Sequence, residues 1–448
     1  MTPALSELRH CFEGAIPSVI ATCAPDGTPN VAYLSQVHYV DDAHVALTFQ
    51  FFNTTRKNIL ANPRAVVQVI DPVSAAHYRL QLEYLRTETE GPLFENMKAK
   101  LAGIASHTGM SKVFRLLGSD VYRVLDIECV FGESSRQAVP RQPLLPGLRA
   151  CLDSLAGCTD LAALFDAVLH GLERHCGIRH AMLLMHDAAR ARLYTVATRG
   201  YAESGVGSEI GVGEGIIGVA ARERTPIRIG YAAQEYLYSR AMREGFEKAA
   251  AGDALETAIP FPGLADSGSQ LAVPVMRGER LHGVLYVESP EQRRFTYEDE
   301  DALVVLATQL ALFIELLAHA VEQNEDAAAC CLPPPVAQGS PVTVRHFAAD
   351  HSVFLGNDYL IKGVAGAIVW KLVRDYVEAG RSEFTNRELR LDPSLKLPDI
   401  SDNLEARLIL LQRRLAERCT FLAIEKTGRG RFRLNVGRPL QLAEVAAR

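Results

Sequence analysis

Basic residues gather near the end of the chain, on a stretch with helical periodicity and on the hairpin signal that follows it. The apolar stripe of the helical stretch consists of Leu404, Leu408, Leu411 and Leu415. Four arginines lie at the border of this stripe or further round the helix: Arg407, Arg413, Arg414 and Arg418. Between Lys426 and Arg438 there are five basic residues and no acid. Such a local patch can neutralise several phosphates of a nucleic acid. The alternative is a solvated basic helix that contacts a protein.

The composition limits the remaining possibilities. A length of 448 residues predicts about three domains. The net charge of −6 gives no overall attraction to nucleic acid, so any such binding must use a local patch. Nine scattered cysteines without CxxC spacing are typical of reduced cytosolic thiols. No apolar run is long enough for a membrane span, and the N-terminus does not look like a secretory signal. We therefore expect a cytoplasmic protein.

Residues 1–132 read as a strand-rich domain with a few short helices, most simply a barrel. Asp26-Gly27 stands between two apolar alternating runs, which predicts a hairpin. The segment NTTRKNILANPRAVVQVID (53–71) reads as a short helix, a break at Pro63 and another strand. No acid, base and nucleophile stand in an arrangement typical of catalysis, so we assign no catalytic residue.

The segments ATCAPDGTPNV (21–31) and TFQFFNTTRKNILANPRAVV (48–67) give this domain a resemblance to split barrels of the pyridoxamine-phosphate-oxidase type. The resemblance implies a dimer with FMN at its interface, or less often haem or deazaflavin. It places Asn53, Thr55, Arg56 and Lys57 on the segment that holds the flavin phosphate. Guanidinium, ammonium, hydroxyl and helix-start N–H groups are what a phosphate requires. The alternative is that Arg56 and Lys57 are solvated, with Phe51-Phe52 in the flavin position. The candidate haem ligands are His38, His77 and His107.

A Pro-rich connection separates this domain from residues 148–325, where helix, strands, a Gly-rich turn at Gly211, helix, strands and a long helix follow one another. This order resembles a GAF domain, an α/β sandwich that senses small molecules. The resemblance implies a ligand pocket roofed by residues 230–270, with Tyr231, Tyr236, Tyr238, Phe246, Asp253, Glu256 and Phe261. The alternative is a lid on an empty core. His186, His282, Asp253 and Glu256 lack metal-ligand spacing, so we predict no metal site.

The long helix that closes this domain begins at the N-cap Thr296, and Thr159 is the expected N-cap of an earlier helix. Its apolar seam consists of Leu303, Leu306, Leu310, Phe313 and Leu317. Such a seam favours contact with a second copy of the chain, although a helix packed on its own sheet needs a similar stripe.

Residues 342–440 read as a strand pair, three helices and a basic hairpin. The segment LQRRL and the hairpin tip TGRGRFRL resemble a winged helix of the response-regulator output type. In that family the third helix enters the DNA major groove and the wing contacts the minor groove or the backbone. The resemblance makes Asn403, Arg407 and Arg414 the candidates for base contacts. The remaining predicted DNA contacts are Arg413, Arg418, Lys426, Arg429 and Arg431.

The sequence thus predicts a multidomain α+β protein: an FMN-binding-type split β-barrel, a central GAF α/β sandwich and a C-terminal winged helix. The leading hypothesis is a homodimeric, ligand- or redox-responsive transcriptional regulator that binds double-stranded DNA. One alternative is a flavin-dependent oxidoreductase with a regulatory tail. Another is a non-enzymatic adaptor that binds a partner protein.

Overall fold

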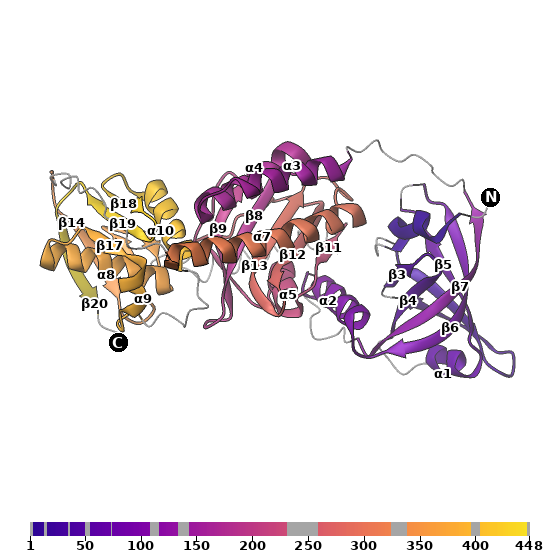
Figure 1. Cartoon of the computed structure of the whole chain (residues 1–448). Helices are drawn as coiled ribbons and strands as arrows, with labels where there is room; N and C mark the ends of the chain where they lie inside the picture. The colour runs from indigo at the N-terminus through magenta and orange to yellow at the C-terminus, as the bar shows by residue number, and fades with distance from the viewer. Residues whose placement is uncertain are drawn as a thin grey trace.

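Three domains follow one another along the chain and lie in a row (Figure 1). The computed structural model describes residues 3–12, 16–34, 36–49, 54–72, 74–107, 116–132, 143–230, 259–323, 338–395 and 404–445. Asn53, Phe51-Phe52, Asn403 and the roof residues 231–258 lie outside the described residues.

The N-terminal domain is built on a sheet with the strand order β2-β1-β5-β6-β7-β4-β3. Its elements are η1 (Leu5–Phe12), β1 (Ser18–Cys23), β2 (Pro29–Leu34), β3 (Val37–Asp41), β4 (His44–Phe49), α1 (Thr54–Ala61), β5 (Arg64–Ile70), β6 (His77–Glu88), α2 (Pro92–His107) and β7 (Gly118–Phe131). The predicted hairpin at Asp26-Gly27 is confirmed, since β1 and β2 pair around it and Gly27 has a φ of +88°. The long strands β6 and β7 curl the sheet around a core of its own.

The central domain has a sheet with the order β10-β9-β8-β13-β12-β11. Its elements are α3 (Leu144–Ala156), α4 (Leu161–Cys176), β8 (His180–Asp187), β9 (Arg192–Arg199), β10 (Glu209–Gly211), α5 (Gly215–Glu223), β11 (Ile227–Ile229), β12 (Ser269–Arg277), β13 (Arg280–Ser289) and α7 (Tyr297–Gln323). Helices α3, α4 and α7 share a core with one face of the sheet. Helix α5, joined by Ala99 from α2, packs on the other face. The N-cap of α4 is Asp160 rather than the predicted Thr159, because the Asp160 carboxylate accepts the Ala163 N–H at 2.9 Å.

Helix α7 directs its predicted seam toward its own sheet. Leu303, Leu306 and Leu310 are at most 1% exposed, so this stripe does not contact a second copy. This corrects the first expectation and supports the alternative of a helix packed on its own sheet. A different apolar line remains on the outer surface of α7, formed by Val305, Leu312 and Leu316. Residues Tyr297–Ala318 are long and apolar enough for a membrane-spanning helix, but 44% of that window is buried inside the protein. The buried stripe accounts for much of its hydropathy.

The C-terminal domain has the predicted order of strands, three helices and a hairpin. Its elements are β14 (Val342–Phe347), β15 (Ser352–Leu355), β16 (Asp358–Ile361), α8 (Gly363–Ala379), β17 (Glu383–Thr385), α9 (Asn386–Leu391), α10 (Leu404–Arg418), β18 (Leu422–Gly428), β19 (Arg431–Val436) and β20 (Leu440–Val445). Strand β20 was not predicted, and it pairs in parallel with β14 across the domain boundary expected at residue 440. Thr385 caps α9 as predicted, since its hydroxyl accepts the Glu388 N–H at 3.2 Å.

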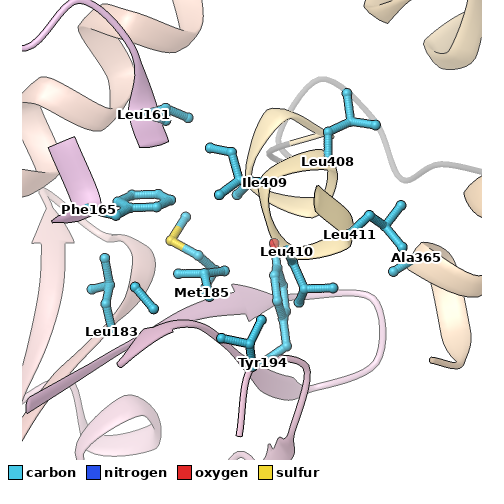
Figure 2. Close-up of a cluster of buried hydrophobic side chains, with 14 of the residues drawn as sticks. Leu161, Phe165, Leu183, Met185, Tyr194, Ala365, Leu408, Ile409, Leu410 and Leu411 are labelled. Carbon is cyan, nitrogen blue, oxygen red and sulfur yellow. The ribbon is translucent and has the colours of Figure 1, made fainter. Parts of the chain in front are cut away.

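The core of the central domain continues into the C-terminal domain. One hydrophobic cluster runs from α3 and α4 through the sheet to α8, α10 and the hairpin β18–β19. Figure 2 shows Phe165 and Met185 of the central domain facing Ile409 and Leu410 of α10. These side chains are at most 4% exposed. The central domain therefore holds the third helix of the C-terminal domain by apolar packing, which is the dominant favourable term in such contacts.

Candidate functional site

The first candidate site is the junction between α10 and the central domain. Arg407 points from α10 to the end of β8, where its Nη2 atom lies 3.0 Å from Oδ2 of Asp187. Its Cζ atom also lies 4.7 Å from the ring centroid of Tyr194 on β9. Both partners of the ion pair have side chains only 5% exposed. Arg407 is therefore occupied inside the protein and is not presented for base contacts.

Two further cations of the predicted DNA surface also bind the central domain. Arg413 donates to the Val196 carbonyl at 2.9 Å and to the Asp166 carboxylate at 2.7 Å. Lys426 of the hairpin lies 3.3 Å from the carboxylate of Asp160, the N-cap of α4. These contacts are more exposed than the Arg407 pair, so each contributes modestly. Together they fix the orientation of α10 on the central domain.

The remaining predicted DNA contacts divide into buried and exposed residues. Arg414 is 3% exposed and its Nε donates to the Leu360 carbonyl at 2.9 Å within the C-terminal domain. It stabilises the domain internally, which corrects its expected role in base contacts. Arg418 and Arg429 are exposed, and Arg431 is half-buried. Of the predicted DNA contacts that the structure describes, those open to solvent thus lie at the end of α10 and on the hairpin.

A cavity lies beside Lys426, between the start of α4 and the hairpin. Its lining includes Asp160, Leu408, Ile409, Glu405 and Phe432, so both domains contribute to it. Burial raises the pKa of Glu405, although Lys426 acts in the opposite direction. The cavity exists only while the two domains are docked.

The second candidate site lies on the sheet face of the central domain that α5 covers. There Glu288 of β13 is 2% exposed, and its carboxylate accepts from the Leu264 N–H at 3.0 Å and the Tyr286 hydroxyl at 3.4 Å. His180 and Gln270 are its neighbours on the adjacent strands β8 and β12. The Tyr201 hydroxyl is buried without a hydrogen bond to any described residue. Burial and the nearby Glu288 carboxylate raise the pKa of Tyr201.

This polar group suits a small ligand with hydrogen-bond donors, because a buried carboxylate favours donors and positive charge. No motif in the sequence predicted this group. The available signal was Glu288 itself, a charged residue at the end of the otherwise apolar strand LHGVLYVES. Of the predicted roof residues, Phe261 is described and is 37% exposed.

The predicted phosphate segment of the N-terminal domain is arranged differently from expectation. Arg56 is bonded to the carboxylate of Asp120 at 2.5 Å, and that carboxylate also accepts from Thr87. The Thr55 hydroxyl accepts from Asn30 at 2.9 Å, and Lys57 is exposed. A flavin phosphate at Arg56 would meet the negative charge of Asp120, which is 5% exposed. These residues therefore fit a flavin phosphate poorly.

His38, His77 and His282 each have surroundings of their own, and the side chain of His107 lies outside the described residues. Burial and the charges of Lys100, Arg228 and Arg9 lower the pKa of His38 to about 3. His77 bonds to Gln68 at 2.8 Å. His282 bonds to Glu315 at 3.0 Å, and burial followed by Arg280 and Arg277 lowers its pKa to about 4. Among the described residues, no three His, Cys, Asp or Glu side chains could hold a metal ion together.

Comparison with known proteins identifies two of the three domains. Residues 4–116 match the family model described as Pyridoxamine 5'-phosphate oxidase, and residues 158–315 match the one described as GAF domain. The chain therefore contains a PNPOx-like N-terminal domain and a GAF domain, as predicted. Both matches end before the C-terminal domain, so the winged-helix assignment has no such support. No curated protein matches the chain.

Several solved structures resemble single domains of the chain. The GAF domain of an Acinetobacter phosphoenolpyruvate-protein phosphotransferase is 21% identical, with 41% of this chain and 98% of that one covered, at a TM-score of 0.32. An FMN-binding protein from Syntrophomonas wolfei is 19% identical, with 28% and 85% covered, at 0.25. Free methionine-R-sulfoxide reductase from Neisseria meningitidis is 21% identical, with 39% and 89% covered, at 0.29.

Proposed function

We propose that the chain is a cytoplasmic transcriptional regulator whose GAF domain holds the DNA-binding helix until a signal releases it. A PNPOx-like domain and a GAF domain together suggest a sensory, regulatory protein. The single observation that carries the finer proposal is the Arg407–Asp187 ion pair at the α10 junction. The same helix face cannot bind the GAF domain and a DNA groove at once, so the two states exclude each other.

Strand β8 connects the proposed ligand site to the junction with α10. Strand β8 begins at His180, beside the polar group around Glu288, and ends at Asp187, the partner of Arg407. A ligand that binds the two arrangements of β8 with different affinity shifts the population of docked α10. In the released state Arg407, Arg413 and Lys426 join Arg418, Arg429 and Arg431 on one basic surface.

The proposal is tested by binding of a random-sequence DNA duplex, measured by fluorescence anisotropy at increasing salt. The released variant Asp166→Asn with Asp187→Asn is expected to bind at least ten times more tightly than the wild type at low salt. Its affinity should fall steeply with added salt, because phosphate contacts release counterions. Asp153→Asn is the matched control, since Asp153 is exposed on α3 away from α10.

Two outcomes would favour the alternatives. If neither protein binds duplex DNA at low salt, the regulator proposal fails and an adaptor that binds a protein through α10 replaces it. A flavin-dependent oxidoreductase is the second candidate, favoured by the match of residues 4–116 to an oxidase family. It predicts flavin absorption bands in the purified protein, and a colourless protein removes it.

We also propose that the regulator acts as a homodimer, since two half-sites in DNA need two recognition helices. The outer line of α7 supports this, because Leu316 is 63% exposed and Val305 is 44% exposed. Exposed apolar side chains at helical spacing suit a helix-to-helix contact. On β2, Tyr33 is 82% exposed and offers a second contact surface.

A further inference from the structure

Three cations surround one aromatic ring where the N-terminal domain meets the GAF domain. The ring is that of Tyr297, in the first turn of α7. The distances from its centroid are 4.1 Å to Cζ of Arg228, 4.5 Å to Cζ of Arg9 and 5.6 Å to Nζ of Lys100. Arg9 comes from η1, Lys100 from α2 and Arg228 from β11, so both domains contribute. Cation–π attraction to one ring offsets only part of the electrostatic repulsion among three positive charges.

Among the described residues, the carboxylate paired with these cations is that of Glu300, whose side chain is 12% exposed. Glu300 bonds to Arg228 at 2.8 Å and lies 3.9 Å from Lys100. Burial acts to raise its pKa, but Lys100, Arg228 and Arg9 lower it overall, so Glu300 is ionised. The neighbouring Glu298 and Asp301 are exposed, and Asp299 is bonded to Thr296 and Arg294. Within the described part of the chain, these three cations therefore outnumber the carboxylates paired with them.

Two of the three cations have unused hydrogen-bonding capacity. Neither Arg9 nor Lys100 makes a hydrogen bond with the part of the chain that the structure describes, and the Nε atom of Arg9 is buried. The Lys100 side chain is 9% exposed and that of Arg228 is 2% exposed. A buried ammonium such as that of Lys100 normally forms hydrogen bonds, because a buried charge without them is costly.

His38 lies near the same three cations. It lies on β3 and its imidazole is held neutral by burial and by the same three cations, which lower its pKa to about 3. The N-terminus of α7 adds partial positive charge from the helix dipole. Arg9 is half-buried between the rings of Tyr39 and Tyr297, so it is the member nearest to solvent.

We propose that this junction binds a small oxyanion with two negative charges, of the phosphate class, between Arg9, Lys100 and Arg228. The anion would balance the excess positive charge and complete the hydrogen bonds of Arg9 and Lys100. Because its ligands come from both domains, binding fastens the N-terminal domain to the GAF domain. The site is separate from Arg56 and Lys57, and it does not depend on DNA binding or on flavin.

The test is isothermal titration calorimetry of the full-length protein with inorganic phosphate, in chloride buffer of constant ionic strength. The wild type is expected to bind phosphate in a saturable way. Lys100→Met, which keeps the side-chain volume, and Arg9→Gln should each weaken binding at least tenfold. Lys57→Met is the matched control, because this exposed lysine lies on α1 of the same domain and should leave binding unchanged.

The results that overturn the proposal are equally specific. Absence of saturable phosphate binding by the wild type overturns it without reference to any variant. It also fails if Lys100→Met and Arg9→Gln, folded by circular dichroism, bind as the wild type does. Loss of binding in Lys57→Met alone would move the anion to the segment predicted for a flavin phosphate.

Discussion

The guanidinium of Arg407 and the carboxylate of Asp187 form an ion pair at 3.0 Å in which both side chains are 5% exposed. The pair joins the third helix of the C-terminal domain to the end of a GAF strand. Its members are buried among apolar residues of both domains. A buried pair of this kind gives specificity of docking, because each charge becomes costly when its partner is removed.

The first prediction concerns this pair. Asp187→Asn removes the carboxylate that faces the buried Arg407 side chain, so docking of α10 should weaken by about 3–5 kcal/mol. Hydrogen exchange of the α10 backbone amides measures the change as faster opening. The double variant Asp187→Asn with Arg407→Met should recover much of the protection, because neither charge remains. Equal protection in the wild type and in Asp187→Asn would show that apolar packing alone holds the helix.

The second prediction concerns Arg56 in the N-terminal domain. Arg56→Ala leaves the Asp120 carboxylate buried without its cation and should destabilise the domain by about 3 kcal/mol at pH 7. Burial already raises the pKa of Asp120 above its ordinary value, although Thr87 and Arg56 act against it. A carboxyl group whose pKa is higher in the folded protein than in the unfolded chain favours folding when it is protonated. The loss of stability caused by Arg56→Ala should therefore become smaller as the pH falls through the pKa of Asp120.

Urea unfolding at pH 7 and pH 4 measures this difference. Arg56→Ala with Asp120→Asn is the control, since it removes both charges and should be nearly insensitive to pH in this range. Lys57→Ala, on the next residue but exposed, should change stability by less than about 0.5 kcal/mol. An Arg56→Ala variant as stable as the wild type at pH 7 would contradict the assigned pairing.

The sequence predicted elements better than it predicted partners. Leu161, Leu164 and Phe165 recur at helical spacing and are all fully buried, because periodicity reports which face of a helix is apolar. Helical periodicity could not show which surface the α7 stripe contacts. The same spacing of apolar residues suits a helix packed on its own sheet and a helix packed in a dimer. Arg407 stands at the border of an apolar stripe, where it could face solvent or a buried acid. Its partner Asp187 lies in another domain, which no local pattern reveals.

The third prediction concerns pH and His38. Burial and three nearby cations lower the pKa of His38 to about 3 in the folded protein, against about 6.5 in the unfolded chain. The stability from neutral His38 is present above pH 6.5 and decreases as the pH falls toward 3. The charged groups that face it are Arg9 on η1, Lys100 on α2 and Arg228 on β11.

Between pH 6.5 and 4 the unfolded chain binds up to one more proton at His38 than the folded protein does. The free energy of unfolding therefore falls by up to about 1.4 kcal/mol per pH unit as the pH decreases. The free energy of unfolding of His38→Gln should therefore depend less on pH between 6.5 and 4 than that of the wild type. Denaturant titrations that follow the N-terminal domain provide the measurement. Identical pH slopes would mean that His38 is protonated in the folded protein.

The fourth prediction concerns the outer line of α7. Leu312 and Leu316 are 40% and 63% exposed, one turn apart, while the opposite stripe of the helix packs on the sheet. Leu312→Glu with Leu316→Glu places two carboxylates on that line and should dissociate a dimer that uses it, without loss of fold. Sedimentation equilibrium measures the mass directly.

Leu391→Glu is the matched control, because Leu391 is 72% exposed on α9 and away from α7. If the double variant keeps the dimer mass, the α7 contact is excluded and the exposed strand β2 becomes the surface to test, with Tyr33→Glu as the variant.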